Sequence, residues 1–528
     1  MNRRDFLQTS GGALAATLSL GELSSQARPD STQMTTSGQR KAPNLLFIIT
    51  DQQRKDTLAA YGNKQIHVPN LNALAAESAV FENYYVTQPL CTPSRGSLMT
   101  GLYPHNHHSY NNNIALPEST PVLAQLLKKN EYVTAYFGKW HLGDEICPQH
   151  GFDYWESTED YYDAGGYTCG RKRSGYADFL VSHGQKPTDA RGTFSRDAAN
   201  AMPKELSKPA YLADVAMEFL EQHNGKPWVM YVSFLDPHTP FHSVNDKMYD
   251  RKDMSVPQTF YDHPDPTELP RDTAIRNFLE EGYEDYQGMI ASADAIRDIE
   301  ARYWGKISLV DEMIGRIRKK LDSLGGADNT IIVFTSDHGE MMGAHKLVFK
   351  SVMYQQTIQV PMVVHVPWLK GKPQRVAHNV SGIDIVPTLL ELMSQPIPAH
   401  LQGRTWAPYL QSRGNLPERD VIVEWNGVPW PPKAMKDYAQ PLRTIITPER
   451  WKMTLAPDGY GLLYNLKNDP EERTNLFYRK SSLDQIRILA ERIHLWQIAT
   501  GDTLMPFDEK AWESLRQKFI QKGVPNLG

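Results

Sequence analysis

Short apolar runs separated by segments with helical signals constrain the fold of this chain more than any other feature of its sequence. The runs cover residues 44–50, 132–137, 228–235, 330–335 and 361–366 and are mostly apolar. Such runs are typical of strands that are buried on both faces of a sheet. Helical signals fall between the first four runs, at 122–127, 211–223 and 303–324. This alternation predicts an α/β fold with a largely parallel sheet and helices on both faces.

The character of the sequence changes after about residue 405. Strand-like segments follow at 421–424, 443–447, 451–455 and 462–466, and helical segments at 483–499 and 510–522 close the chain. We therefore predict a large α/β domain over 43–405 and a smaller α+β subdomain over 406–528. Residues 155–196 are rich in Gly, Tyr and Arg and are predicted to form a long functional loop.

The N-terminal segment is predicted to direct export. Arg3 and Arg4 precede Phe6-Leu7, and a small, weakly apolar run covers residues 11–20. This pattern is typical of a twin-arginine signal, which we place at 1–30, followed by a polar linker at 31–42. The alternative is a disordered basic tail. The run is much shorter than the ~20 residues of a membrane span. No later segment is long and apolar enough to be one, so we expect an exported protein, periplasmic or extracellular, without a membrane span.

Net charge and cysteine content narrow the classes of partner. A formal net charge of -5 over 528 residues gives no general reason to expect nucleic acid or an acidic membrane surface. The three cysteines, Cys91, Cys147 and Cys169, are too few for a disulfide scaffold. If one of them has a special chemical role, the other two could pair in an oxidising compartment; three free thiols are the alternative.

Polar side chains follow two of the predicted strands. Asp51-Gln52 ends the first run, and Asp337-His338 follows the run at 330–335. Ligands bind outside the carboxyl ends of strands in open α/β sheets, so these two pairs could meet around one hard cation, which favours oxygen ligands. The alternative is that each Asp only caps the helix that follows its strand.

The strongest local signal is the segment 91–101, CTPSRGSLMTG. It resembles the Cys-x-Pro-x-Arg signature of the formylglycine-dependent sulfatases, in which the cysteine is oxidised to an aldehyde before folding. The resemblance implies that a cysteine-oxidising maturation enzyme converts Cys91 to formylglycine. The alternative is a buried structural cysteine on a proline-capped turn. Because Pro93 suits the first turn of a helix, residue 91 is predicted to lie just before a helix N-terminus, which favours an anion.

Further segments extend the resemblance over roughly residues 43–480. They are 138–143 (GKWHLG), 236–241 (DPHTPF), the region of Lys350, 382–390 and 463–476. The resemblance implies an alkaline-phosphatase-like fold, in which a central mixed sheet is flanked by helices and a smaller α+β subdomain follows. The domain over 43–405 would then be the catalytic one.

The resemblance also assigns roles to individual residues. It implies a divalent cation, Ca²⁺ in preference to Mg²⁺ or Mn²⁺, at a site formed by Asp51, Gln52, the modified Cys91, Asp337 and His338. The family often has a second Asp in place of Gln52 and an Asn in place of His338, and a His nitrogen suits Ca²⁺ less well than an oxygen. The implied catalytic residues are Cys91, Arg95, Lys139, His141, His238 and Lys350.

In the implied mechanism, one hydroxyl of the hydrated aldehyde attacks sulfur and the other later expels sulfate. His238 would protonate the leaving alcohol with help from Lys350, and His141 would take the proton from the remaining hydroxyl. Arg95 and Lys139 would neutralise the sulfate. Lys346 is the alternative to Lys350, and Glu340 is expected to orient the metal loop.

The function predicted from the resemblance is removal of sulfate from a sulfated carbohydrate. A formylglycine-dependent phosphonate monoester or phosphodiester hydrolase is the nearest alternative. A non-catalytic protein that binds sulfated glycans is a third hypothesis, but a binding protein has no need of the whole catalytic set. The candidate substrate-binding residues are Tyr110, Asn111, Asn112 and Asn113, which follow the Cys91 helix, and Arg171 and Arg173, for which a solvated basic loop is the alternative.

Overall fold

The computed structural model describes residues 41–127, 132–162, 164–281, 288–369, 375–428, 438–503 and 505–527. The predicted export signal at 1–30 and nearly all of the predicted linker at 31–42 lie outside the described residues. The chain from Ala42 to Gly528 is one compact unit. Within the described part of the chain, no helix combines the length and the apolar character that a membrane crossing requires.

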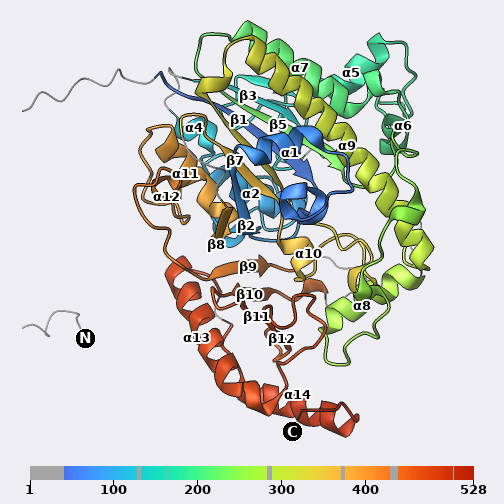
Figure 1. Ribbon diagram of the computed structural model, residues 1–528, viewed down its shortest axis with the longest axis vertical. Coiled ribbons are helices and arrows are strands. Elements are labelled where there is room, and N and C mark those ends of the chain that lie inside the picture. The colour runs from blue at the N-terminus through green and yellow to red at the C-terminus, as the bar shows by residue number, and fades with distance from the viewer. Residues whose placement is uncertain are drawn as a thin grey trace, which may run out of the picture. The chain divides into compact units, whose positions relative to one another are not determined.

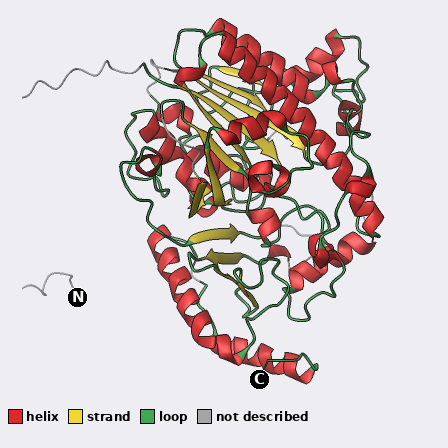
Figure 2. Ribbon diagram, in the orientation of Figure 1, coloured by secondary structure: helices red, strands yellow, loops and turns green. Residues whose placement is uncertain are grey.

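The large sheet has eight strands in the order β4-β3-β5-β1-β6-β7-β2-β8 (Figures 1 and 2). Strand β7 is antiparallel to both of its neighbours and the other pairings are parallel, so the sheet is mixed. The strands are β1 Asn44–Asp51, β2 Ala79–Tyr85, β3 Val133–Gly138, β4 Tyr154–Glu156, β5 Trp228–Pro237, β6 Thr330–Ser336, β7 Met362–His365 and β8 Arg375–Ser381.

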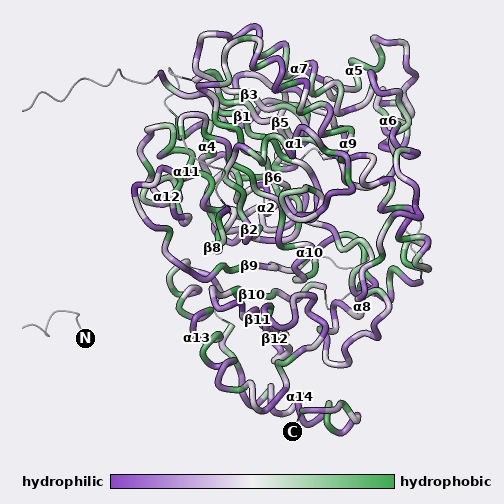
Figure 3. Tube along the Cα trace, in the orientation of Figure 1, coloured by the Kyte–Doolittle hydropathy of each residue, from purple (hydrophilic) through white to green (hydrophobic). Residues whose placement is uncertain are grey.

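Strand β1 shows why both faces of this sheet are apolar. All eight of its residues are buried, and alternate side chains enter different cores. Leu46 and Ile48 pack with α1 Pro69–Ala76, α7 Lys208–Gln222 and α9 Ala293–Ser323. Leu45, Phe47 and Ile49 pack with α2 Cys91–Thr100, α4 Leu123–Leu126 and α11 Ile385–Leu392. Figure 3 shows apolar segments gathered along the strands between these two layers of helices. The predicted sheet with helices on both faces is confirmed.

A second, antiparallel sheet follows with the order β12-β11-β10-β9. Its strands are β9 Val421–Trp425, β10 Leu442–Ile446, β11 Trp451–Leu455 and β12 Gly461–Asn465. Ile445, Met453 and Leu463 pack in one core with α13 Leu483–Thr500 and α14 Glu509–Gln521. The four predicted strands and two predicted helices of this region are confirmed to within one or two residues. The boundary at 405–406 stays a prediction, because the chain from Ala42 onward is one compact unit.

Several elements escaped the sequence analysis. Strands β2 and β8 were not predicted, because Glu82 and Asn83 interrupt the apolar run of β2, and β8 is an edge strand with exposed residues between buried ones. The prediction of a loop over 155–196 was wrong in part. The segment includes the end of β4 and helix α5 Gly175–Ser182, which Ser174 caps and Tyr176 anchors in the core. The remaining helices are α3 Pro104–His107, α6 Arg196–Asn200, α8 Pro270–Glu281, α10 Gln355–Ile358 and α12 Ala407–Leu410.

Candidate active site

Two buried carboxylates lie at the carboxyl edge of the large sheet. Asp51 is the last residue of β1, and Asp337 directly follows β6. These strands are parallel neighbours in which Thr50 pairs with Ser336, so the two Asp residues emerge together. Both are completely buried. Because an isolated buried carboxylate is very costly, the surrounding groups must compensate for both charges.

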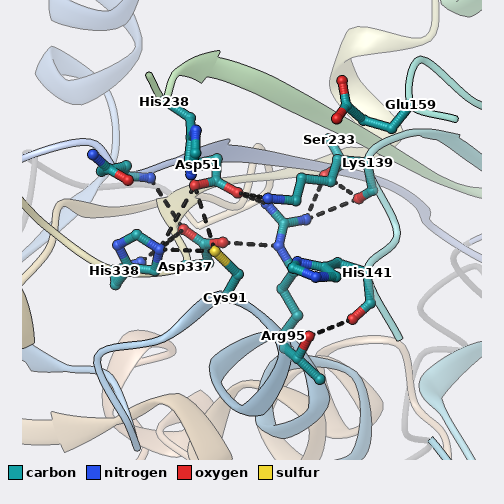
Figure 4. A network of polar contacts seen from close by, with 12 residues as sticks. Asp51, Cys91, Arg95, Lys139, His141, Glu159, Ser233, His238, Asp337 and His338 are labelled. Carbon is teal, nitrogen blue, oxygen red and sulfur yellow. Dashed lines mark hydrogen bonds and ion pairs between the residues drawn. The ribbon is translucent and has the colours of Figure 1, made fainter. Parts of the chain in front are cut away.

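Two cationic side chains, Arg95 and Lys139, neutralise the charge on the Oδ2 atoms of these carboxylates (Figure 4). Arg95 donates from Nε to Asp337 Oδ2 at 2.8 Å and from Nη2 to Asp51 Oδ2 at 3.0 Å. Lys139 donates from Nζ to the same Asp51 oxygen at 2.7 Å. Arg95 also donates from Nη1 to Ser233 Oγ and the carbonyl of Lys139, so its guanidinium is held rigidly. The predicted catalytic residues Arg95 and Lys139 therefore form one network with the predicted metal ligands.

The other oxygen of each carboxylate, Oδ1, lies close to His338 and Cys91. Asp51 Oδ1 and Asp337 Oδ1 each lie 3.6 Å from His338 Nε2. Cys91 Sγ lies 3.2 Å from the same nitrogen. His338 Nδ1 lies 2.9 Å from the carbonyl of Gly339, which favours a tautomer with Nε2 unprotonated. One ligand atom from each of these four residues lies within 4.8 Å of the others. Two carboxylate oxygens, an imidazole nitrogen and the atom at position 91 suit a divalent cation.

Gln52 lies at the edge of this cluster. Its Oε1 accepts a hydrogen bond from Lys350 Nζ at 2.7 Å, and its Nε2 donates to Glu340 Oε2. Glu340 Oε1 in turn accepts the backbone N–H groups of Met342 and Phe349. Glu340 thus holds the loop after β6, as expected. The role of Gln52 as a fifth metal ligand stays a prediction.

Cys91 begins helix α2, all ten residues of which are buried. The expectation that residue 91 lies just before a helix was wrong by one position, because Leu90 is the extended residue that precedes the helix and Cys91 is its first residue. Gly96 is required for the packing of this helix. A Cβ atom there would lie 2.5 Å from the ring of His107, so any other residue would have to displace this buried ring.

The electrostatics at residue 91 favour an anion. Burial and the charge of Asp51 raise the pKa of the Cys91 thiol, but the nearby cations, chiefly Lys139 and Lys350, outweigh them and lower it to about 7. The N-terminus of α2 adds a partial positive charge at the same position. The site can therefore hold a negatively charged group beside its carboxylate pair.

His238 and Lys350 form a pair next to the cluster. His238 Nδ1 lies 2.8 Å from the carbonyl of Thr239, and Lys350 Nζ lies 2.9 Å from His238 Nε2. Burial and the charge of Lys350 hold the pKa of His238 far below its usual range. His238 is therefore neutral and accepts a hydrogen bond from Lys350. These contacts favour Lys350 over Lys346 as the predicted lysine.

His141 lies on the Lys139 side of Cys91 (Figure 4). Its ring stacks on Tyr162 with centroids 3.7 Å apart, and its Nε2 lies 3.2 Å from Asn113 Oδ1. Burial and the charge of Lys139 hold its pKa far below the usual range, so the imidazole is neutral. The sequence analysis missed Tyr162, and it also missed Glu145, which accepts the N–H groups of residues 140 and 141. No motif marks either residue.

The candidate substrate-binding residues differ in their surroundings. Tyr110 is exposed, whereas Asn111 is buried. Asn112 Oδ1 accepts the backbone N–H of Thr92 at 3.1 Å and thereby positions the start of α2. Two arginines are paired with acidic neighbours at the surface, Arg171 with Glu156 and Arg173 with Asp178. Their predicted roles in substrate binding stay predictions.

Lys306, on α9, fixes the segment that carries His238. Its Nζ donates to the carbonyl of His238 at 2.9 Å and to that of Pro240 at 3.0 Å, and it lies 3.2 Å from Asp236 Oδ1. The side chain is completely buried. Lys306 touches none of the groups gathered around Cys91, so it is a positioning residue for His238.

We expect Lys306→Met to impair most the hydrolysis of esters with poor leaving groups. If His238 shifts, kcat/KM for an alkyl sulfate should fall about 10²-fold, because proton donation typically contributes ~10²–10⁴-fold. Hydrolysis of 4-nitrophenyl sulfate, whose leaving group needs little protonation, should fall only a few-fold. Steady-state rates over a leaving-group series measure this difference. Arg316→Met on the exposed face of the same helix is the control, and an equal loss for both esters would contradict the role.

Cys147 and Cys169 form a disulfide, so the alternative of three free thiols is wrong. Cys91 is the free cysteine among the described residues, and it is buried. The bond closes a segment with a sequence separation of 22 residues that includes Tyr162. It therefore ties down the chain that supports His141.

Removing this bond with Cys147→Ser/Cys169→Ser is expected to lower the free energy of unfolding by about 3 kcal/mol, because a closed loop of this length restricts the unfolded chain by that amount. Urea denaturation followed by circular dichroism measures the change. Wild-type protein denatured in dithiothreitol should show the same shift. An unchanged midpoint in both experiments would contradict the prediction.

A model of the sulfatase family, described as Sulfatase, matches residues 43–395. The chain belongs to the sulfatase family. A second model, described as N-sulphoglucosamine sulphohydrolase, C-terminal, matches residues 343–498. The predicted resemblance is thus confirmed, and so is the prediction that this sulfatase is a sulfuric ester hydrolase.

Relatives and solved structures agree with this assignment. The sulfatase is 30% identical over 447 residues to the ulvan-active sulfatase of Formosa agariphila, which covers 82% of this chain and 77% of the relative. It superposes on the phosphonate monoester hydrolase of Agrobacterium radiobacter with a TM-score of 0.74 at 25% identity, covering 87% and 96% of the two chains. A structure in complex with its substrate D-glucosamine-2-N,6-O-disulfate gives a TM-score of 0.71 at 21% identity, covering 88% and 99%, and shows the shared fold. The predicted alkaline-phosphatase-like fold is confirmed.

Proposed function

We propose that this sulfatase hydrolyses a sulfate ester of a carbohydrate with formylglycine at position 91 as its nucleophile. One observation carries the proposal: Cys91 lies in a buried frame of Asp51, Asp337, Arg95 and Lys139 that favours an anion. The names of two similar proteins support a carbohydrate substrate, one active on ulvan and one bound to a disulfated glucosamine.

The modified residue 91 supplies a hydrated aldehyde, whose hydroxyls are better suited to sulfate transfer than a thiol. Arg95 and Lys139 neutralise the sulfate and the charge that develops during transfer. The proton shared between Lys350 Nζ and His238 Nε2 is available to the oxygen of the leaving alcohol. Neutral His141 accepts the proton of the remaining hydroxyl, which allows release of sulfate.

Asp51, Asp337, His338 and Gln52 would hold a divalent cation beside residue 91. When bound, the cation would supply further charge stabilisation for the sulfate oxygens. Ca²⁺ is our preferred ion because oxygen atoms dominate the donor set, with Mg²⁺ and Mn²⁺ as alternatives. Metal analysis of the purified protein and reactivation after EDTA treatment with each ion would identify it.

We also propose that the protein is modified by a cysteine-oxidising enzyme and then exported to the periplasm or beyond the cell. The twin-arginine pattern at Arg3-Arg4 supports export. The Cys147–Cys169 disulfide supports the same proposal, because such bonds persist in oxidising compartments.

Two coupled measurements test the function. Mass spectrometry of the peptide that contains residue 91 should show the aldehyde or its hydrate in protein from a host that converts this motif. Sulfate release from a panel of sulfated sugars should then identify the substrate. An aldehyde with turnover of a phosphonate monoester instead of any sulfate ester would favour the alternative hydrolase, and an unmodified thiol would refute the proposed nucleophile.

A further inference from the structure

A cavity of about 580 Å³ lies beside the catalytic residues and takes part in none of the steps described above. Its walls include Tyr161, Tyr162, Arg196, Phe241, His242 and Arg302. Its volume falls within the ~300–1,000 Å³ that is typical of sites for small molecules. We refer to this cavity as the side pocket.

The side pocket adjoins the reaction centre on two sides. Tyr162 forms part of its wall, and the same ring stacks on His141 at 3.7 Å and lies 5.7 Å from Lys139 Nζ. Thr239 and Pro240, also in the wall, directly follow His238 in the chain. The wall of the side pocket thus contacts the surroundings of His141 on one side and continues the segment of His238 on the other.

Arg196 fixes the aromatic wall. Its guanidinium lies 5.5 Å from the ring centroid of Tyr161 and 5.8 Å from that of Tyr162, and Nη2 donates to the Tyr162 hydroxyl at 3.0 Å. Glu159, which is buried, accepts from Arg196 Nε at 2.8 Å and holds the guanidinium in place. The ring of Tyr161, which is exposed and held by Arg196, offers a preorganised surface for the apolar face of a sugar ring.

Arg302 is the cation in the wall of the side pocket that is most open to a ligand. Arg196 is neutralised by Glu159, which is buried and also pairs with Lys208. Arg302 adds a second cation in the wall. Its ion pair with Asp298 is exposed, with relative side-chain exposures of 41% and 42%, and exposed pairs are weak. The Asp298 contact engages Nη2, so a ligand that reaches this guanidinium would compete with a weak, exposed partner. Asp197, which pairs with His242, is the acidic group in the wall.

We propose that the side pocket holds the sugar ring that bears the scissile sulfate and that Arg302 binds a second anionic substituent on that sugar, a further sulfate or a carboxylate. This inference rests on the proposed function and deepens it, because it makes the substrate a doubly charged sugar. A bidentate contact between a guanidinium and a sulfate or carboxylate provides strength and geometric selectivity together.

Competition against hydrolysis of 4-nitrophenyl sulfate tests the inference with four defined sugars. Glucosamine 2-N,6-O-disulfate is compared with glucosamine 6-sulfate, and glucuronic acid 2-sulfate with glucose 2-sulfate. The inhibition constant of the doubly charged member of at least one pair should be lower by about tenfold, as expected for one charge-assisted contact. The pair that shows the effect identifies the second anion as sulfate or carboxylate.

Arg302→Ala should reduce this ratio to less than about twofold, because the guanidinium that distinguishes the two sugars is gone. Arg297→Ala, on the same helix but paired with Asp294 and outside the side pocket, should keep the full ratio. Equal inhibition within both pairs by the wild-type enzyme, or an unchanged ratio in Arg302→Ala, would overturn the inference. Failure of the proposed function is distinguishable, because the wild-type enzyme would then release no sulfate from the reporter ester.

Discussion

Replacing Cys91 with alanine is expected to lower kcat/KM for sulfate release by about 10⁵-fold, because loss of a covalent nucleophile costs far more than loss of one acid–base group. The frame of Asp51, Asp337, Arg95 and Lys139 is still present in this variant, so a metal ion and a sulfate ester can still bind. Steady-state kinetics with 4-nitrophenyl sulfate and with the best sugar substrate provide the measurement.

The matched control for Cys91→Ala is its stability. The side chain is small and buried, and the ion pairs around it join other residues. The midpoint of thermal unfolding should therefore change by only about one degree, which corresponds to about 1 kcal/mol in a chain of this size. Residual activity above one part in about a hundred, in a protein verified by mass spectrometry, would show that residue 91 is not the nucleophile.

Asp51→Asn is expected to lose activity by at least about 10³-fold and to lower the free energy of unfolding by about 3–5 kcal/mol. The carboxylate accepts from both Arg95 and Lys139, and all three side chains are completely buried. Without its charge, Asp337 alone faces two cations, and the cation site loses one of its carboxylates. Enzyme kinetics, metal analysis and urea denaturation monitor the three effects.

The double variant Asp51→Asn/Lys139→Met separates these effects. It restores the charge balance between Arg95 and Asp337, so we expect it to regain much of the lost stability. It should regain no activity, because both the metal ligand and the cation for the sulfate are absent. If the double variant is no more stable than Asp51→Asn, the buried charges are not coupled as the structure indicates.

The proximity of Asp51 and Asp337 could be predicted from the sequence, because both residues lie at the carboxyl ends of strands of the same sheet. Asp51 and Asp337 follow apolar runs, and parallel strands bring their ends together. The signature that begins at Cys91 is too specific to occur readily by chance. The close approach of the His107 ring explains why this signature has a glycine at position 96. The main elements of both sheets were predictable for similar reasons, since their strands are buried on both faces or separated by clear turns.

The residues that support the frame could not be predicted. Lys306 acts through backbone carbonyls of residues 238 and 240, and such contacts leave no pattern in the sequence. Tyr162 reaches His141 from a segment whose path depends on a disulfide between Cys147 and Cys169. Arg171 and Arg173 are each paired with an acidic neighbour, which the sequence analysis did not anticipate, and their roles in substrate binding stay predictions.

The burial of Cys91 has a consequence for how the active enzyme is produced. Its side chain is 1% exposed, at the start of a helix that is buried along its whole length. If residue 91 is modified as we propose, the modifying enzyme must act before α2 packs, so modification and folding compete in each newly made chain. A chain that folds before modification would keep an unmodified Cys91 and would be folded but inactive. Under this proposal, the ratio of the two rates sets the active fraction of a preparation, and two batches of identical sequence and purity would differ in specific activity.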